Sequence, residues 1–220
     1  MHLTNAAAPR GREKLVVLVN YIGQLRPYSY ADILLLLAWL NSSWSSVAGA
    51  SMLWFGFLVY LEWQHRDRGR LHWHWLVWIS LWICGIAILS FAAVPFVIAA
   101  VLYSQKKRFP VIAIVSCLIN GLVKGLLLLS IGVADFRTLV VVGVMSFRNL
   151  MGDLRDVDKD REEGVQTLPV HLRVAHSIPL VYPITLLLTS LLWIVLGHTN
   201  FVWLVAAWGV QLLTYSWTPR

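Results

Sequence analysis

The acidic residues of this 220-residue chain are concentrated in one stretch, from Gly152 to Gly164, which holds six of the eleven. If this stretch continues a helix, Asp153, Asp156 and Asp160 stand at positions i, i+3 and i+7 and share one face. Like charges on one face repel each other unless a cation lies among them. Mg²⁺ commonly binds one or two carboxylates together with phosphate oxygens of a substrate. One interpretation of the spacing is therefore that Asp153, Asp156 and Asp160 are Mg²⁺ ligands.

A second interpretation of the same stretch is a solvated charge run. Arg155, Lys159 and Arg161 alternate with the acidic residues and would neutralise them without a metal. The spacing alone leaves both interpretations open.

The composition is that of a membrane protein. The chain is 58% hydrophobic and 13% charged, and its mean hydropathy is +0.68. The apolar residues form long runs without period-two alternation, which predicts transmembrane helices and excludes a β-barrel. The net charge of +7 comes from residues at the ends of these runs, so we expect no nucleic-acid partner. Cys84 and Cys117 lie inside apolar runs and show no zinc-ligand spacing.

We predict an all-α fold, a polytopic bundle of about eight transmembrane helices. Residues 1–28 form a cytoplasmic or interfacial segment, whose apolar patch from Leu15 to Ile22 is too short to span, and residues 29–217 form a single transmembrane domain. The predicted helices cover residues 31–46, 48–65, 72–89, 91–105, 110–131, 136–152, 177–196 and 200–216.

Cationic residues gather in every second connection of this arrangement, which predicts that these connections are cytoplasmic. They are Arg10, Arg12, Lys14, Arg26, Arg66, Arg68, Arg70, Lys106, Lys107, Arg108, Arg155, Lys159, Arg161, Arg173 and Arg220. The acidic stretch lies on the same side. Carboxylates for a metal and cations for phosphate oxygens would thus share one rim above an apolar bundle, which suits a diphosphate with a hydrocarbon tail.

Lys124 differs from the other cations because it lies in the middle of a predicted helix. An ionisable side chain inside a membrane is expected to have a function. The alternative is that Lys124 reaches the interface or pairs with Asp135.

Several motifs together resemble the UbiA superfamily of intramembrane prenyltransferases. Asp153, Asp156 and Asp160, followed by Thr167-Leu168-Pro169, match its second Asp-rich motif, Asp-x-x-Asp-x-x-x-Asp. Arg148-Asn149 resembles the residues that precede this motif in the family. The other similarities are Tyr103 with Lys106, Lys107 and Arg108 between the fourth and fifth helices, and Arg26-Pro27 at the start.

The resemblance implies an all-helical fold around a cavity open to lipid. In the family, two Asp-rich motifs bind Mg²⁺ and a prenyl diphosphate, and the prenyl group passes to an aromatic or other lipophilic acceptor. On this resemblance Asp153, Asp156 and Asp160 are the catalytic residues and metal ligands. The candidate diphosphate-binding residues are Lys107, Arg108, Arg148, Lys124 and Tyr103, and the partners are a prenyl diphosphate, a lipophilic acceptor and membrane lipid.

Two features depart from the family pattern. The first Asp-rich motif, Asn-Asp-x-x-Asp-x-x-x-Asp, aligns with Leu61, Glu62, His65 and Gly69, so that Glu62 is the one carboxylate left as a metal ligand at the motif's spacing. The family usually has nine helices, one more than predicted here.

Three other functions stay open. A UbiA-type terpene cyclase would quench the carbocation internally, and a catalytically degenerate relative would bind an isoprenoid without turnover. A transporter would place ionisable residues at mid-membrane in paired broken helices, and Lys124 is its main support.

Overall fold

The computed structural model describes residues 10–65 and 73–217, with side chains described from Val17 onward. Within these ranges every regular element is a helix, as the sequence predicted. The α-helices are α1 (Arg10–Gln24), α2 (Pro27–Trp39), α3 (Trp44–Gln64), α4 (Trp75–Leu89), α5 (Val94–Ser104), α6 (Pro110–Ile114), α7 (Ser116–Ser130), α8 (Phe136–Arg155), α9 (Val157–Glu162), α10 (Leu168–His171), α11 (Val181–Gly197) and α12 (Phe201–Thr214). The 3₁₀ turns are η2 (Phe91–Ala93), η3 (Gln105–Lys107) and η4 (Tyr215–Trp217).

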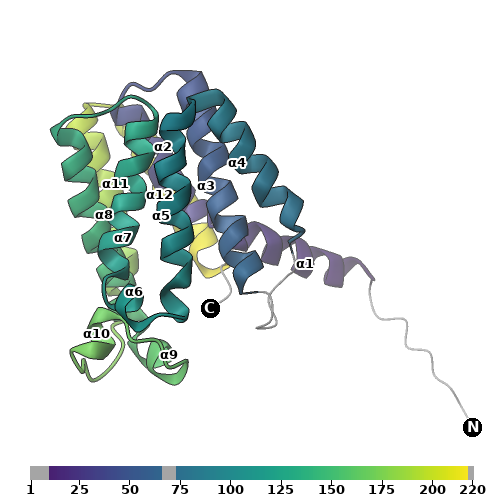
Figure 1. Cartoon of the computed structure of the whole chain (residues 1–220), viewed down its shortest axis with the longest axis vertical. Coiled ribbons are helices and arrows are strands. Elements are labelled where there is room, and N and C mark those ends of the chain that lie inside the picture. The colour runs from purple at the N-terminus through teal and green to yellow at the C-terminus, as the bar shows by residue number, and fades with distance from the viewer. Residues whose placement is uncertain (1–9, 66–72, 218–220) are drawn as a thin grey trace, which may run out of the picture.

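The longer helices form an up-and-down bundle (Figure 1). α3 packs against α4, α7 against α8, and α2 against both α11 and α12. α1 lies across one end of the bundle and contacts η4 near the C-terminus. The short helices α9 and α10 extend beyond the bundle at this same end (Figure 1). The connection that carries the acidic stretch therefore lies at the same end of the bundle as α1.

Each predicted helix overlaps an observed one, but the first boundaries were wrong. The segment predicted as 31–46 is α2, which begins at Pro27 and ends at Trp39. Proline suits a first helical turn, because the amide hydrogen that it lacks has no partner there. The break comes at Leu40–Ser43, where Asn41 has a positive φ of 50° and the Ser43 side chain caps α3 by accepting from the Ser46 amide. The predicted boundary at residues 28 and 29 accordingly falls inside α2.

Two other predicted helices are each divided. The segment 110–131 consists of α6 and α7, separated at Val115. The segment 91–105 consists of η2 and α5, with Pro95 in the first turn of α5.

The close approach of α7 and α8 positions the residues of the candidate site. A Cβ added at Gly121 would lie 2.0 Å from Ser146 Oγ and 2.5 Å from the Val142 carbonyl oxygen. Only glycine fits between these helices at that point. The paired helices place Ser116 of α7 within hydrogen-bond distance of Asp153 of α8, and Lys124 of α7 in the same cavity lining as Arg148 of α8.

One described helix is long and apolar enough to cross a membrane, namely α3, Trp44–Gln64. The helices α4, α7 and α11 and the segment Phe201–Trp217 are apolar but shorter. Composition and length therefore show one candidate span among the described residues.

Candidate functional site

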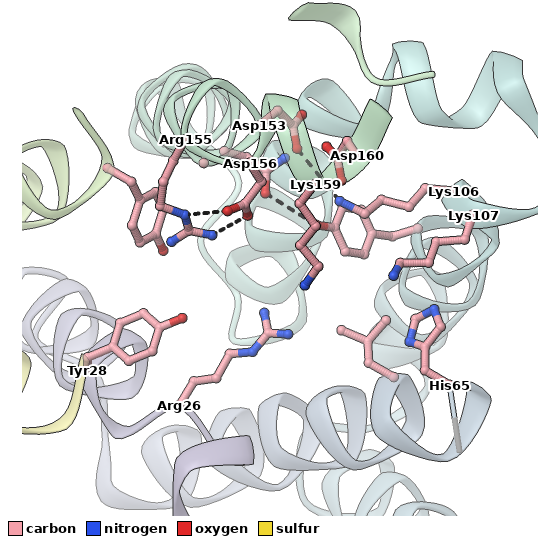
Figure 2. A pocket seen from close by; sticks show the side chains of 15 residues that line it. Arg26, Tyr28, His65, Lys106, Lys107, Asp153, Arg155, Asp156, Lys159 and Asp160 are labelled. Carbon is pink, nitrogen blue, oxygen red and sulfur yellow. Dashed lines mark hydrogen bonds and ion pairs between the residues drawn. The ribbon is translucent and has the colours of Figure 1, made fainter. Parts of the chain in front are cut away.

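A polar pocket of about 160 Å³ opens where α8 and α9 meet the ends of α2, α3 and α5. Figure 2 shows acidic side chains along one wall, with basic side chains on the opposite wall and between them. The lining residues are Arg26, Tyr28, Leu61, His65, Tyr103, Lys106, Lys107, Asn149, Gly152, Asp153, Arg155, Asp156, Lys159, Asp160 and Tyr182.

The acidic wall is formed by two helices rather than one. α8 ends at Arg155, Asp156 leaves the helical conformation with φ −100° and ψ 11°, and α9 begins at Val157. The acidic stretch therefore does not form one continuous helix, and α8 extends three residues beyond the predicted end at residue 152. Asp160 still donates its amide hydrogen to the Asp156 carbonyl over 2.8 Å, so the bend keeps roughly the helical phase. As a result Asp153, Asp156 and Asp160 line the same pocket, as their spacing predicted.

Two hydroxyl groups orient the outer members of this triad. Ser116, at the start of α7, donates to Asp153 over 3.2 Å. Thr167, which is fully buried, donates to Asp160 over 3.1 Å. The Thr167-Leu168-Pro169 segment thus folds back onto the acidic stretch. Each of these carboxylates keeps a second oxygen for another partner.

Lys106 lies among the three carboxylates, with its Nζ 3.6 Å from Asp153 Oδ1. Burial opposes the charge of Lys106, but Tyr103 and the three aspartates raise its pKa above the ordinary value. Burial also raises the pKa of Asp160 to about 6, against the opposing effects of Lys106 and the Thr167 hydrogen bond. The pocket therefore holds carboxylates whose charges are only partly compensated.

The basic residues of the acidic stretch do pair with its acids. Arg155 forms an ion pair with Asp156, Lys159 with Glu163, and Arg161 with Asp158. Burial would raise the pKa of Asp156, but Arg155, Lys106 and Lys159 hold it below its ordinary value.

Asp158 is absent from the lining of the pocket. Its side chain accepts from the Ser177 amide over 3.0 Å and anchors the connection to α11.

The opposite wall is cationic. Arg26 and His65 face the acidic wall across the pocket, and Lys107 points in beside them (Figure 2). Lys107 also pairs with Glu163 over 2.5 Å. Glu62, predicted as a metal ligand, does not line the pocket; it is 3% exposed and lies 4.0 Å from Arg26.

Arg108 is not brought into the pocket. It is exposed, and its guanidinium lies 3.5 Å from Gln64 Oε1. Asp67, Gly69 and the other residues of the first motif's second half lie outside the described residues.

A smaller inner cavity of about 40 Å³ lies next to the pocket and shares Arg26, Tyr28, Tyr103, Asn149 and Tyr182 with it. Lys124 and Arg148, both predicted as diphosphate partners, line this inner cavity and not the outer pocket. Tyr103 borders both spaces, and its hydroxyl donates to Asn149 Oδ1 over 3.3 Å.

The partner of Arg148 is Asp32, a residue that the sequence analysis missed. Asp32 is fully buried in α2 and forms an ion pair with Arg148. Ser190 of α11 donates to Asp32 over 3.1 Å and accepts from Gln211 of α12 over 2.6 Å. This network joins α2, α8, α11 and α12. The sequence could have indicated Asp32, because it is an acidic residue inside an apolar run. As for Lys124, an ionisable side chain in such a run is expected to have a function.

Two buried donors of the site have no hydrogen-bond partner, Asn149 Nδ2 and Arg26 Nε. Buried polar groups are rarely unpaired, and an unexplained one points to a missing ion, water or ligand. Both donors belong to residues that line both spaces, and both suit an anionic ligand.

The chemistry of the carboxylates fits Mg²⁺ in the presence of a phosphate. Among the described residues no group of three or more His, Cys, Asp and Glu side chains converges to hold a metal by protein atoms alone. Mg²⁺ retains several waters and commonly uses one or two carboxylates plus substrate phosphates. Asp153, Asp156 and Asp160, two of them oriented by hydroxyl groups, supply this kind of donor set.

Comparison of the chain with protein-family models, with curated proteins and with solved structures gives no match in any of the three.

Proposed function

We propose that this chain is a membrane prenyltransferase of the UbiA type. It would use Mg²⁺ to bind a prenyl diphosphate and would transfer the prenyl group to an aromatic or other lipophilic acceptor. The observation that carries the proposal is the outer pocket, where three aspartates of one motif meet Arg26, Lys106 and Lys107. A diphosphate needs metal-binding carboxylates and cations within one small volume.

The outer surface of the bundle supports a multi-pass membrane protein. Large apolar side chains point outward from helix after helix, and their exposed fractions reach 40% or more. Examples are Ile83 at 61%, Leu122 at 50%, Leu139 at 74%, Leu188 at 58% and Leu212 at 68%. Soluble proteins rarely expose so many large apolar residues together, whereas a bilayer covers them. The pocket would then open on the cytoplasmic side, where the cationic connections lie.

In this proposal Asp153, Asp156 and Asp160 would hold Mg²⁺ against the diphosphate. The bound metal would supply charge neutralisation on the diphosphate as the allylic bond breaks. Lys106, Lys107 and Arg26 would bind phosphate oxygens and stabilise the departing diphosphate. Asn149 would donate its unpartnered amide hydrogens to the same ligand.

The opposite wall favours one alternative, a degenerate isoprenoid-binding protein. Leu61 and His65 line the pocket where the family pattern has Asn and Asp. Imidazole is a poor ligand for Mg²⁺, so the described part of this wall offers cations rather than metal ligands. Binding without turnover would follow if both carboxylate sets were needed for ionisation. A terpene cyclase would share the ionisation step and differ in its product.

The test is Mg²⁺-dependent release of diphosphate from geranyl, farnesyl and geranylgeranyl diphosphate by detergent-purified protein. The variants are Asp153→Ala and Asp156→Ala, with Glu162→Gln as the matched control, because Glu162 is an exposed acid on α9 outside the pocket. We expect release in the wild type and the control and none in the two alanine variants. The organic product separates transferase from cyclase. Mg²⁺-dependent binding without release would instead establish the degenerate binder.

A further inference from the structure

The pairing of Asp156 with Arg155 separates the middle aspartate of the triad from the outer two. Arg155 donates from Nε to Asp156 Oδ1 over 2.8 Å and from Nη2 to Asp156 Oδ2 (Figure 2). Asp153 and Asp160 each accept from a hydroxyl group with one oxygen instead. A two-pronged pair between a guanidinium and a carboxylate is stronger than a single hydrogen bond. Asp156 is therefore the aspartate whose two oxygens are both held by a cation of the chain itself.

Arg155 has further partners that do not depend on Asp156. Its Nη1 donates to the Tyr215 hydroxyl over 3.0 Å, and its guanidinium carbon lies 4.6 Å from the ring centroid of Tyr182. The rings of Tyr182 and Tyr215 are stacked, with centroids 6.0 Å apart. Aromatic faces attract a guanidinium. The two tyrosines thus hold Arg155 at the lining of the outer pocket even when Asp156 turns away.

Asp156 lies where a change of partner needs little rearrangement. Its backbone joins α8 to α9 outside the helical conformation, and its side chain is 30% exposed. A carboxylate in such a place can change its rotamer without moving a helix. Because Asp156 lines the pocket together with Asp153 and Asp160, it can turn from Arg155 toward a metal held by those two.

Release of Asp156 would leave the charge of Arg155 without its carboxylate. The Arg155 side chain is 14% exposed, so water screens its charge only in part, and a buried cation is costly unless it is paired. A metal ion alone would add positive charge to a pocket that already contains Arg26, Lys106 and Lys107. A diphosphate brings negative charge, and the planar fork of a guanidinium suits phosphate oxygens as well as a carboxylate.

We propose that Arg155 makes metal binding by Asp156 depend on diphosphate. Without ligands Arg155 holds both oxygens of Asp156. When Mg²⁺ and diphosphate are both bound, Asp156 turns to the metal, and Arg155 donates to a phosphate oxygen while it stays against Tyr182. This inference rests on the proposed function, because it takes Mg²⁺ and diphosphate as the ligands of the outer pocket. Arg155 is then a positioning residue for the metal site and a further partner of the diphosphate.

The test compares the wild type with Arg155→Met and Arg155→Lys, as full chains in nanodiscs of zwitterionic lipid. Calorimetry measures the binding of Mg²⁺ alone and of inorganic diphosphate at saturating Mg²⁺. Arg155→Lys keeps the charge but lacks the planar fork that holds both oxygens, and it replaces the methionine variant if that one does not fold. Arg161→Met is the matched control, because Arg161 pairs with Asp158 in the same stretch and neither residue lines the pocket.

We expect the two ligands to respond in opposite directions. Arg155→Met should bind Mg²⁺ alone about 10-fold more tightly than the wild type, because the competing charge-assisted hydrogen bonds are gone. It should bind diphosphate at saturating Mg²⁺ about 10-fold more weakly, because a phosphate partner is lost. Arg155→Lys should show part of both changes, and Arg161→Met should bind both ligands as the wild type does. A residue that only stabilises the fold would not produce opposite changes.

Mg²⁺ binding that is unchanged or weaker in Arg155→Met would overturn the proposal, because Arg155 would then not compete for Asp156. A gain in Arg155→Met with none in Arg155→Lys would also overturn it, since removal of a neighbouring positive charge would explain the gain. Unchanged diphosphate binding in Arg155→Met would exclude the exchange of partners. In each of these cases the wild type still binds Mg²⁺ and diphosphate. If the wild type binds no diphosphate at saturating Mg²⁺, the proposed function itself fails, and this inference fails with it.

Discussion

The outer pocket and the inner cavity contain similar residues but differ in how their charged side chains are buried and paired. In the outer pocket three carboxylates lie around Lys106, and several neighbouring cations are partly exposed. Arg148, which lines the inner cavity, and its partner Asp32 behind it are both almost fully buried and form a direct ion pair with further hydrogen bonds. The outer charges can rearrange around a ligand, because water reaches them. The inner charges are fixed, so that a missing partner there has a large cost.

The largest expected effect comes from breaking the inner pair. Arg148→Met leaves the buried Asp32 carboxylate without its ion-pair partner and should lower the free energy of unfolding by about 3–5 kcal/mol. The measurement is thermal unfolding in detergent. The double variant Asp32→Leu/Arg148→Met is the control and should recover most of the loss, since it removes both charges. An Arg148→Met variant as stable as the wild type would contradict the contrast between the two regions.

The outer triad should show the opposite pattern, with loss of binding and little loss of stability. Asp153→Asn and Asp156→Asn should each weaken Mg²⁺-dependent binding of inorganic diphosphate by more than about 100-fold, because loss of a metal ligand exceeds the 10–100-fold effect of an outer-shell residue. Calorimetry measures the binding. Glu162→Gln should bind as the wild type does. Equal losses in the control and the aspartate variants would exclude a specific role for the triad.

The hydroxyl groups behind the triad should have an intermediate effect. Ser116→Ala and Thr167→Val remove the hydrogen bonds to Asp153 and Asp160. Each should weaken Mg²⁺ affinity about 10-fold, at the low end of the range for residues that orient metal ligands. A titration of Mg²⁺ at saturating diphosphate measures this. Ser177→Ala is the control, because the Ser177 hydroxyl accepts from the Asp158 amide outside the pocket. This variant should bind Mg²⁺ with unchanged affinity.

The smallest effect is a pH dependence of the metal-free protein. Burial raises the pKa of Asp160 from an ordinary 3.8 to about 6, so the folded state binds more protons than the unfolded state in this window. The contribution of Asp160 to stability is therefore full below pH 4 and is lost as the pH rises through about 6. Relative to Asp160→Asn, the wild type should lose stability over this range in thermal melts. If the stability difference between the wild type and Asp160→Asn did not change with pH, the raised pKa of Asp160 would be contradicted.

The sequence predicted the outer pocket better than the inner cavity for a physical reason. The spacing of Asp153, Asp156 and Asp160 places them on one side even with the bend at Asp156, because the Asp160 amide still bonds the Asp156 carbonyl. The pairing of Arg148 with Asp32 joins residues far apart in the chain, and no local pattern indicates which helices meet. Lys124 was recognised by its place in an apolar run, but its aromatic and amide neighbours depend on packing.

Sequence patterns also fail to distinguish adjacent basic residues. Lys107 and Arg108 were both predicted to bind diphosphate, and Lys106 was not. The η3 turn places Lys106 and Lys107 in the pocket and leaves Arg108 exposed near Gln64. Helix boundaries depend on similarly local geometry, such as the left-handed conformation of Asn41 that ends the α2 region.

The most direct test of a metal–diphosphate site is the electron paramagnetic resonance of Mn²⁺, used in place of Mg²⁺, on the purified full chain. We predict that Mn²⁺ binds together with inorganic diphosphate, that its spectrum shows coupling to phosphorus, and that this signal is lost in Asp156→Asn and kept in Glu162→Gln. A phosphorus-coupled Mn²⁺ signal that survives in Asp156→Asn, or its absence from the wild type, would contradict the assignment of the three aspartates.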